Sequence, residues 1–199
     1  MVKFIFDLDG TVTRQETLPL LARSFGIEEE ISLLTKETVE GRIPFVESFI
    51  RRVHILGKCP VKQVNKLLAD IKLYPKIAHF IVNHKDSCCI ATGNLDCWVD
   101  GLINRLSCEY YCSSALVEND KVSKLVSILK KEDVVRRYQG QGDKVVFIGD
   151  GNNDVDAMRL ADVAIASGIT HYPAPGAISA ADYLVVSEEA LCRQLNQLL

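Results

Sequence analysis

The start of the chain constrains the fold more than any other stretch. Residues 2–6, Val-Lys-Phe-Ile-Phe, form a run that is too short for a helix and rich in aromatic and β-branched side chains, which predicts a buried strand. The strand ends in two aspartates, Asp7 and Asp9, with Gly10 behind them. Ligands bind at the carboxyl ends of the strands in open α/β sheets, so one carboxylate can act as a nucleophile and the other as an acid. Paired aspartates also occupy turns and helix caps, and the pair alone leaves both interpretations open.

Strand-like and helix-like segments alternate in the later part of the chain. Strands are predicted at 87–91, 110–113, 144–148, 163–166 and 183–186. Helices are predicted at 75–81, 97–106, 125–135, 155–160 and 188–198. This alternation predicts an α/β fold with a parallel, doubly wound sheet.

Four short helices are predicted between the first strand and the rest of the sheet. Their spans are 17–25, 28–40, 44–57 and 60–71. We therefore expect a catalytic core made of residues 1–13 and 74–199, and a helical cap domain made of residues 14–73. Because the insert follows the strand that ends in Asp7 and Asp9, it should lie over the carboxyl ends of the sheet, where it can act as a lid.

Composition excludes several classes of partner. The chain has 199 residues, 48% of them hydrophobic and 25% charged, which suits an ordinary globular protein with a substantial core. A net charge of -3 supplies no broad basic field, so no nucleic-acid partner is expected. No apolar run is long enough to span a bilayer, and the start lacks a signal-peptide pattern. The seven cysteines have no C-x-x-C or zinc spacing and suit buried thiols in a reducing compartment. We expect a cytoplasmic protein with no membrane partner, either a monomer or a homodimer.

Four polar motifs together supply the groups that phosphoryl transfer requires. They are Asp7 with Asp9, Thr92-Gly93-Asn94, a lysine within 121–124, and Gly149-Asp150-Gly151-Asn152-Asn153-Asp154. The reaction needs a carboxylate nucleophile, hydroxyl and backbone N–H groups for phosphate oxygens, a lysine to offset charge, and acidic residues for Mg²⁺. Each motif alone also fits a turn or a helix start, so it is their combination that favours a phosphoryl-transfer site.

In these motifs the sequence resembles the haloacid dehalogenase superfamily of phosphohydrolases. The resemblance implies that Asp7 attacks phosphorus and becomes an aspartyl-phosphate. It implies that Asp9 protonates the leaving alcohol and then activates water. It also implies a Mg²⁺ ion held by Asp7, the backbone carbonyl of Asp9 and Asp150, with Asp154 in support.

The same resemblance implies the residues of the phosphate site. Thr92 and the N–H of Gly93 would bind phosphate oxygens, and Asn153 would lie beside the substrate. Lys124, which opens a predicted helix, is the preferred motif lysine, and Lys121 is the alternative. A lysine in this position would offset the negative charge around phosphorus.

The predicted cap resembles the helical cap of phosphoserine phosphatases. The resemblance rests on residues 15–17, 26–30, 35–37, 40–41 and 45–53. It implies that Glu16 meets the substrate amine and that Arg52 grips the substrate carboxylate, a pairing that suits an amino-acid phosphate. The alternative is that Glu16 caps a helix and Arg52 belongs to a solvated edge.

Two features depart from the phosphoserine phosphatase pattern. Thr92-Gly93-Asn94 stands where that family carries Ser-Gly-Gly, so the Asn94 side chain is expected near the substrate as an additional binding residue. Residues 118–123 look much shorter than the hairpin that precedes the family's lysine. The loop at 168–176 could border the mouth of the site, and its His171 is expected to be a surface residue.

The leading prediction is a Mg²⁺-dependent phosphomonoester hydrolase that acts on phosphoserine or a similar small amino-acid phosphate. A phosphotransferase that passes the phosphoryl group to a small alcohol would use the same motifs. A phosphatase of the same superfamily with a different small phosphorylated metabolite is a further alternative. The last alternative is a non-catalytic binding module with this fold.

Overall fold

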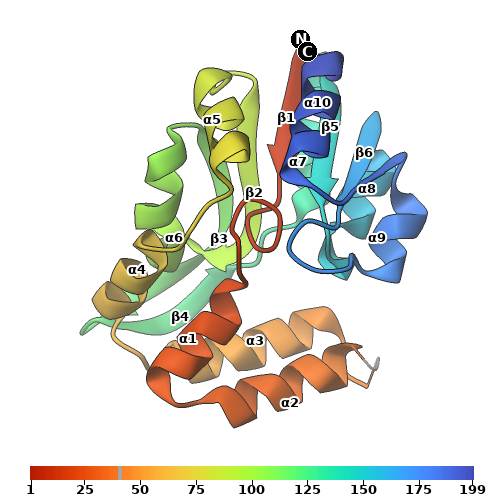
Figure 1. Cartoon of the computed structure of the whole chain (residues 1–199). Helices are drawn as coiled ribbons and strands as arrows, with labels where there is room; N and C mark the ends of the chain where they lie inside the picture. Colours follow the sequence, from red (N-terminus) through yellow and green to blue (C-terminus); the bar gives the residue numbers. More distant parts are fainter. Residues whose placement is uncertain (40–41) are drawn as a thin grey trace.

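Strand β1 (Val2–Phe6) lies at the centre of a seven-stranded sheet in the computed structural model, which describes residues 1–39 and 42–199 (Figure 1). The strand order is β4-β3-β2-β1-β5-β6-β7, and every neighbouring pair runs parallel except β3 and β4. The other strands are β2 (Cys88–Leu95), β3 (Glu109–Glu118), β4 (Lys121–Ser127), β5 (Lys144–Gly149), β6 (Val163–Ser167) and β7 (Tyr183–Val185). The predicted α/β fold with a doubly wound parallel sheet is confirmed.

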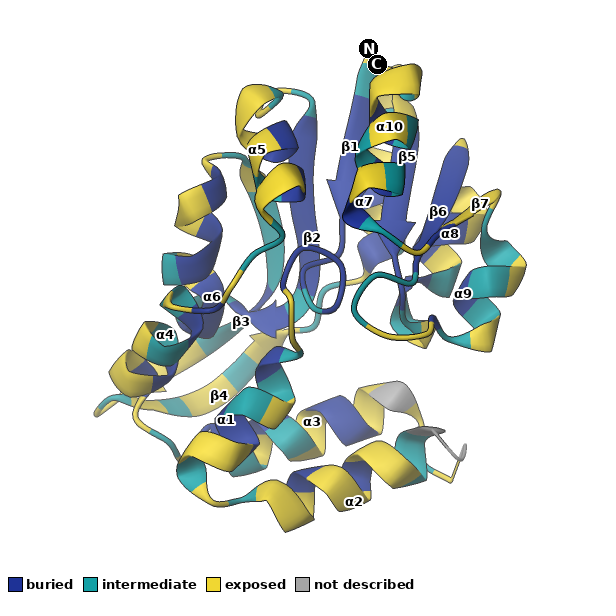
Figure 2. Ribbon diagram, in the orientation of Figure 1, coloured by how far each residue is buried: buried dark blue, intermediate teal, exposed yellow. Residues whose placement is uncertain are grey.

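Alternate side chains of β1 enter two separate cores, one on each face of the sheet. Phe4 and Phe6 belong to the core covered by α5, α6 and α10, whereas Ile5 belongs to the core covered by α7, α8 and α9. These helices are α5 (Pro75–Asn83), α6 (Asp96–Ile103), α7 (Lys131–Gly140), α8 (Val155–Leu160), α9 (Pro175–Ala180) and α10 (Glu188–Leu198). Burial on both faces explains why the central strands are continuous apolar runs, and Figure 2 shows them buried.

The insert between β1 and α5 forms four helices. They are α1 (Thr17–Phe25), α2 (Glu28–Val39), α3 (Phe45–Leu56) and α4 (Val61–Ala69). Figure 1 shows α1, α2 and α3 beyond the carboxyl ends of the strands, while α4 packs along α6. Where the chain leaves and re-enters the core, Thr13 and Leu73 form a β-bridge and the Arg14 N–H donates to the Lys72 carbonyl at 2.9 Å. This pairing supports the expected boundaries between core and cap near residues 13 and 74. The division into two domains stays a prediction.

The predicted helix at 125–135 is wrong. Its first part is strand β4, which pairs antiparallel with β3 across a turn at Asn119 and Asp120, where φ is 50° and 62°. Asn and Asp tolerate this left-handed conformation and favour tight hairpins. The apparent shortening of residues 118–123 disappears, because the chain has a hairpin here. Apolar residues at 125, 126, 128 and 129 imitate a helix face, but pairing with β3 decides the structure.

Two other expectations concern helices. The predicted end of the second helix at Glu40, followed by Gly41, lies outside the described residues. The sequence did not indicate α9, which begins at Pro175.

Within residues 1–39 and 42–199, no helix has both the length and the apolar character needed to cross a membrane.

Candidate active site

Strands β1, β2 and β5 bring the predicted motifs together at one edge of the sheet. Phe6, the last residue of β1, pairs with Ile90 of β2 and with Ile148 near the end of β5. Asp7 and Asp150 directly follow β1 and β5, Thr92 lies within β2 two residues after Ile90, and all three line a pocket of about 550 Å³. The pocket also brings in six other predicted residues, Asp9, Glu16, Arg52, Gly93, Asn94 and Asn153. It lies between the sheet and the helices α1–α3, because residues of all three helices contribute to its wall.

A buried lysine that the sequence analysis missed lies beside the first aspartate. Lys131 Nζ is 2.6 Å from Asp7 Oδ1 and 2.5 Å from Asp154 Oδ1, and the three residues are at most 5% exposed. Burial lowers the pKa of Lys131, but Asp154 and Asp7 together outweigh burial and raise that pKa above its ordinary value. Burial raises the pKa of Asp7 well above its ordinary value, and Lys131 opposes the rise. The ammonium group therefore compensates the charge of two carboxylates that have left water.

The prediction of Lys124 as the site lysine is contradicted by its position. Lys124 and the alternative Lys121 are exposed on strand β4, whereas the lysine paired with Asp7 and Asp154 is Lys131. Lys131 instead begins α7, with Glu132 and Asp133 in the first turn of that helix. The site lysine does open a helix, as the resemblance implied, but the helix starts later because β4 comes first.

Asp9 is held by the cap and by the residue that departs from the family pattern. Its Oδ1 accepts a hydrogen bond at 2.8 Å from the backbone N–H of Thr17, the first residue of α1. Its Oδ2 accepts a hydrogen bond at 2.5 Å from Asn94 Nδ2. Asn94 Nδ2 also donates to Thr17 Oγ1 at 3.0 Å. Burial raises the pKa of Asp9, and the hydrogen bonds from Thr17 oppose the rise. Asn94 therefore orients Asp9, in addition to lining the pocket.

The loop after β5 is built around Asp154. Its Oδ2 accepts the N–H groups of Asp150 and Gly151, at 3.0 and 2.9 Å. A Cβ added to Gly149 would lie 2.5 Å from that same oxygen, so only glycine fits there. Asp150 Oδ1 accepts the hydroxyl of Thr11 at 2.9 Å. These contacts fix the orientation of both carboxylates, and Asp150 lines the pocket.

The buried acidic residues fit a magnesium ion. Carboxylate oxygens of Asp7, Asp150 and Asp154 all lie within 4.8 Å of one another, and the three residues are buried. Oxygen-only ligands are what Mg²⁺ prefers. Lys131 pairs with two of the three carboxylates, those of Asp7 and Asp154, and a divalent cation would balance the remaining buried negative charge.

The phosphate side of the pocket is formed by the end of β2. Thr92 is 1% exposed, and its Oγ1 accepts the backbone N–H of Asn94 at 3.2 Å. The Thr92 O–H thus remains available as a donor to a ligand oxygen. Gly93 lies beside it, and Asn153, from the loop after β5, lines the same pocket.

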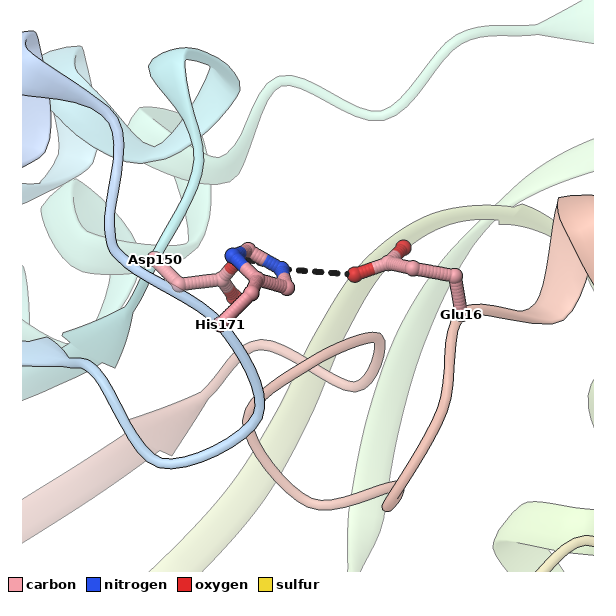
Figure 3. Close-up of side chains that lie close together, drawn as sticks. All are labelled: Glu16, Asp150 and His171. Atoms are coloured by element: carbon pink, nitrogen blue, oxygen red, sulfur yellow. Dashed lines mark hydrogen bonds and ion pairs between the residues drawn. The ribbon is translucent and has the colours of Figure 1, made fainter. Parts of the chain in front are cut away.

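His171, expected at the surface, points into the pocket between Glu16 and Asp150 (Figure 3). Its Nε2 is 2.9 Å from Glu16 Oε1 and 3.2 Å from Asp150 Oδ2, and its Nδ1 is 3.1 Å from the Tyr172 carbonyl oxygen. Hydrogen bonding to Asp150, with added contributions from Tyr172 and Glu16, raises the pKa of His171 to about 10. Burial and the nearby aspartates raise the pKa of Glu16 to about 7, although His171 opposes this.

Arg52 brings an unpaired cationic side chain from the cap to the pocket. It lies on α3, and its buried Nε has no hydrogen-bond partner among the described residues. Burial lowers the pKa of Arg52. Arg52 itself lines the pocket, where its positive charge suits an anionic ligand. Arg51, its neighbour, is exposed and pairs with Glu47 at 2.5 Å.

Acidic groups lie at the carboxyl edge of a doubly wound sheet, an arrangement that suits a phosphatase. The chain belongs to the haloacid dehalogenase-like hydrolases, whose family model matches residues 4–162. The resemblance noted from the motifs is thereby confirmed, including its phosphoserine phosphatase-like character.

Similar proteins agree on this class. The phosphoserine phosphatase of Methanocaldococcus jannaschii is 27% identical over 177 residues, which cover 81% of this chain and 83% of that protein. The phosphoserine phosphatase of Saccharomyces cerevisiae is 27% identical over 181 residues, which cover 82% of this chain but only 58% of the yeast protein. A solved structure of a phosphoserine phosphatase with bound substrate has a TM-score of 0.81 and 25% identity, covering 99% of this chain and 98% of that chain.

Proposed function

We propose that this phosphatase is a Mg²⁺-dependent phosphomonoester hydrolase that works through a phosphorylated Asp7 and acts on phosphoserine or a similar small amino-acid phosphate. The observation that carries the proposal is the arrangement of the first two aspartates. Asp7 is fixed by the buried Lys131, whereas Asp9 is held separately by Thr17 and Asn94. Two carboxylates with different partners can take different roles in one reaction.

In the first step, an Asp7 carboxylate oxygen forms a bond to phosphorus while the bond from phosphorus to the ester oxygen breaks. Protonated Asp9 gives its proton to the departing alcohol oxygen, and its raised pKa favours the protonated form that this transfer needs. Thr92, the N–H of Gly93 and Lys131 would stabilise the charge that develops on the phosphoryl oxygens.

In the second step, the ionised Asp9 takes a proton from water as the water oxygen attacks phosphorus. The bond between phosphorus and the Asp7 oxygen breaks, which releases inorganic phosphate and leaves Asp7 as a carboxylate and Asp9 protonated, as before the first step. Asp7, Asp150 and the Asp9 carbonyl would hold Mg²⁺, with Asp154 in support. Once bound, the ion would neutralise phosphoryl charge.

The substrate assignment rests on the two cap residues. Arg52 supplies a guanidinium to the pocket, which suits a carboxylate, and Glu16 supplies a half-exposed carboxylate to the same pocket, which suits an ammonium group. Phosphoserine carries both complementary groups next to its ester. The similarity to phosphoserine phosphatases supports the same choice.

The proposal is tested by a substrate screen with and without Mg²⁺. We expect phosphate release from O-phosphoserine in the presence of Mg²⁺, loss of activity on chelation, and recovery when Mg²⁺ is restored. The screen should include phosphorylated amino acids, sugars and nucleotides. A folded protein with no Mg²⁺-dependent release from any of these compounds would contradict the proposal.

Replacing the cap arginine should separate carboxylate recognition from chemistry. We expect Arg52→Ala to raise KM for phosphoserine by roughly 10–100-fold, since a hydrogen-bonded charge contributes about 1.5–3 kcal/mol. Activity on phosphoethanolamine, which lacks the carboxylate, should change little. Arg51→Ala is the matched control, because Arg51 is exposed and paired on the cap surface. Equal losses on both substrates would show that Arg52 does not recognise the carboxylate.

A further inference from the structure

The loop between β6 and α9 places an imidazole on the carboxylate assigned to the substrate amine. His171 Nε2 lies 2.9 Å from Glu16 Oε1, and both residues line the pocket (Figure 3). Gly10 makes this approach possible. A Cβ added there would come within 2.8 Å of Glu16 Oε1 and 2.9 Å of His171 Nε2, and φ at Gly10 is +69°.

The direction of the ring shows that His171 acts as a donor to Glu16. Nδ1 faces the Tyr172 carbonyl oxygen at 3.1 Å, and a carbonyl oxygen only accepts hydrogen bonds. Nε2 faces two carboxylates, at 2.9 Å from Glu16 Oε1 and 3.2 Å from Asp150 Oδ2, and the oxygens of ionised carboxylates likewise only accept hydrogen bonds. The imidazole therefore offers Glu16 the same interaction that a substrate ammonium would offer.

We propose that His171 is a specificity-determining residue that takes the place of a substrate ammonium on Glu16, so that the pocket accepts phosphorylated hydroxy acids as well as phosphorylated amino acids. The inference rests on the proposed function, because Glu16 and Arg52 must contact the group that carries the phosphate. A substrate ammonium group has to displace the imidazole before it can pair with Glu16. The cost of breaking the contact between His171 and Glu16 cancels most of the binding free energy that the new pair would contribute. A hydroxyl at the same carbon leaves the imidazole in place. Arg52, which binds the carboxylate common to both classes, then supplies the main selection.

The test compares two substrates that differ in one group. O-phospho-L-serine and the 3-phosphoglycerate of the same configuration differ only in an ammonium or a hydroxyl at the second carbon. We expect their kcat/KM values to agree within about tenfold in the unmodified protein. In His171→Ala the ratio should shift toward phosphoserine by roughly 10–100-fold, the usual range for a hydrogen bond between charged groups. Any effect that His171 has on catalysis through Asp150 changes the kcat/KM of both substrates equally, so it cancels in the ratio of the two values.

Two further variants make the result specific. Glu16→Gln combined with His171→Ala should return the ratio to its original value, because the freed carboxylate is gone. His79→Ala, at an exposed histidine on α5 that contacts Asn83, should leave both kcat/KM values unchanged. An unmodified protein that prefers phosphoserine more than 100-fold, or a ratio that His171→Ala does not shift, overturns the inference. Absence of Mg²⁺-dependent hydrolysis of every phosphate, p-nitrophenyl phosphate included, is instead the failure of the proposed function.

Discussion

Replacing Asp7 with asparagine is expected to abolish turnover without unfolding the protein. The amide keeps the shape of the side chain but is a very poor nucleophile, so no phosphorylated intermediate forms. We expect kcat to fall by about 10⁴-fold or more, the scale seen when a covalent nucleophile is removed. Phosphate release under single-turnover conditions, with acid-quenched protein assayed for covalently bound phosphate, measures both the rate and the intermediate.

The same substitution should not lower the stability of the metal-free protein at neutral pH. Burial raises the folded-state pKa of Asp7 above its unfolded value, so this carboxyl contributes stability at low pH that is lost as pH rises through the folded pKa. Asparagine does not ionise, so Asp7→Asn avoids this loss of stability at neutral pH. Asp156→Asn, at an exposed residue of α8, is the control and should leave turnover unchanged. An Asp7→Asn protein that is folded and retains more than a few per cent of kcat would rule out the nucleophile.

The position of the site at the strand ends could be predicted because it depends on short-range patterns. Asp7 and Asp150 each follow an apolar strand directly, and parallel pairing of β1 with β5 brings two such ends together. Thr92 follows from the same rule on the other side of β1. Burial of the central strands on both faces produces the continuous apolar runs that reveal them in the sequence.

The lysine could not be placed because its position depends on a long-range pairing. Apolar residues of β4 repeat at a spacing that also fits a helix, and only the partner strand β3 resolves the ambiguity. Two local signals did point to the correct arrangement. Asn119-Asp120 is a hairpin turn pair, and Glu132 with Asp133 marks the first turn of the helix that Lys131 opens.

The contact between His171 and Glu16 has no local signature at all. The two residues are far apart in the sequence, and their side chains are half-exposed. A histidine in a loop with glycine and prolines is typical of a surface turn. What brings it inward is the Ala174 N–H, which donates to the Asp150 carbonyl oxygen at 2.8 Å and ties the loop to the site.

Replacing Lys131 with methionine is expected to damage both activity and stability. The variant keeps the length of the side chain but leaves Asp7 and Asp154 facing each other in a buried site without their shared ammonium group. Breaking a buried pair by removing one partner costs about 3–5 kcal/mol. We expect a drop of that order in the free energy of unfolding without Mg²⁺, and a fall in kcat of about 10²–10³-fold, as for loss of one preorganised charge stabiliser.

Lys124→Met is the matched control, because Lys124 lies on exposed β4 and surface substitutions usually stay within about 0.5 kcal/mol. The double variant Asp7→Asn with Lys131→Met separates the two causes of instability. If uncompensated carboxylates are responsible, removing the charge at Asp7 should restore part of the lost stability, a coupling visible in a double-mutant cycle. If Lys131 contributes only its packing, the double variant will be no more stable than Lys131→Met. A large loss of activity in Lys124→Met would show that the lysine needed for activity is Lys124 on β4.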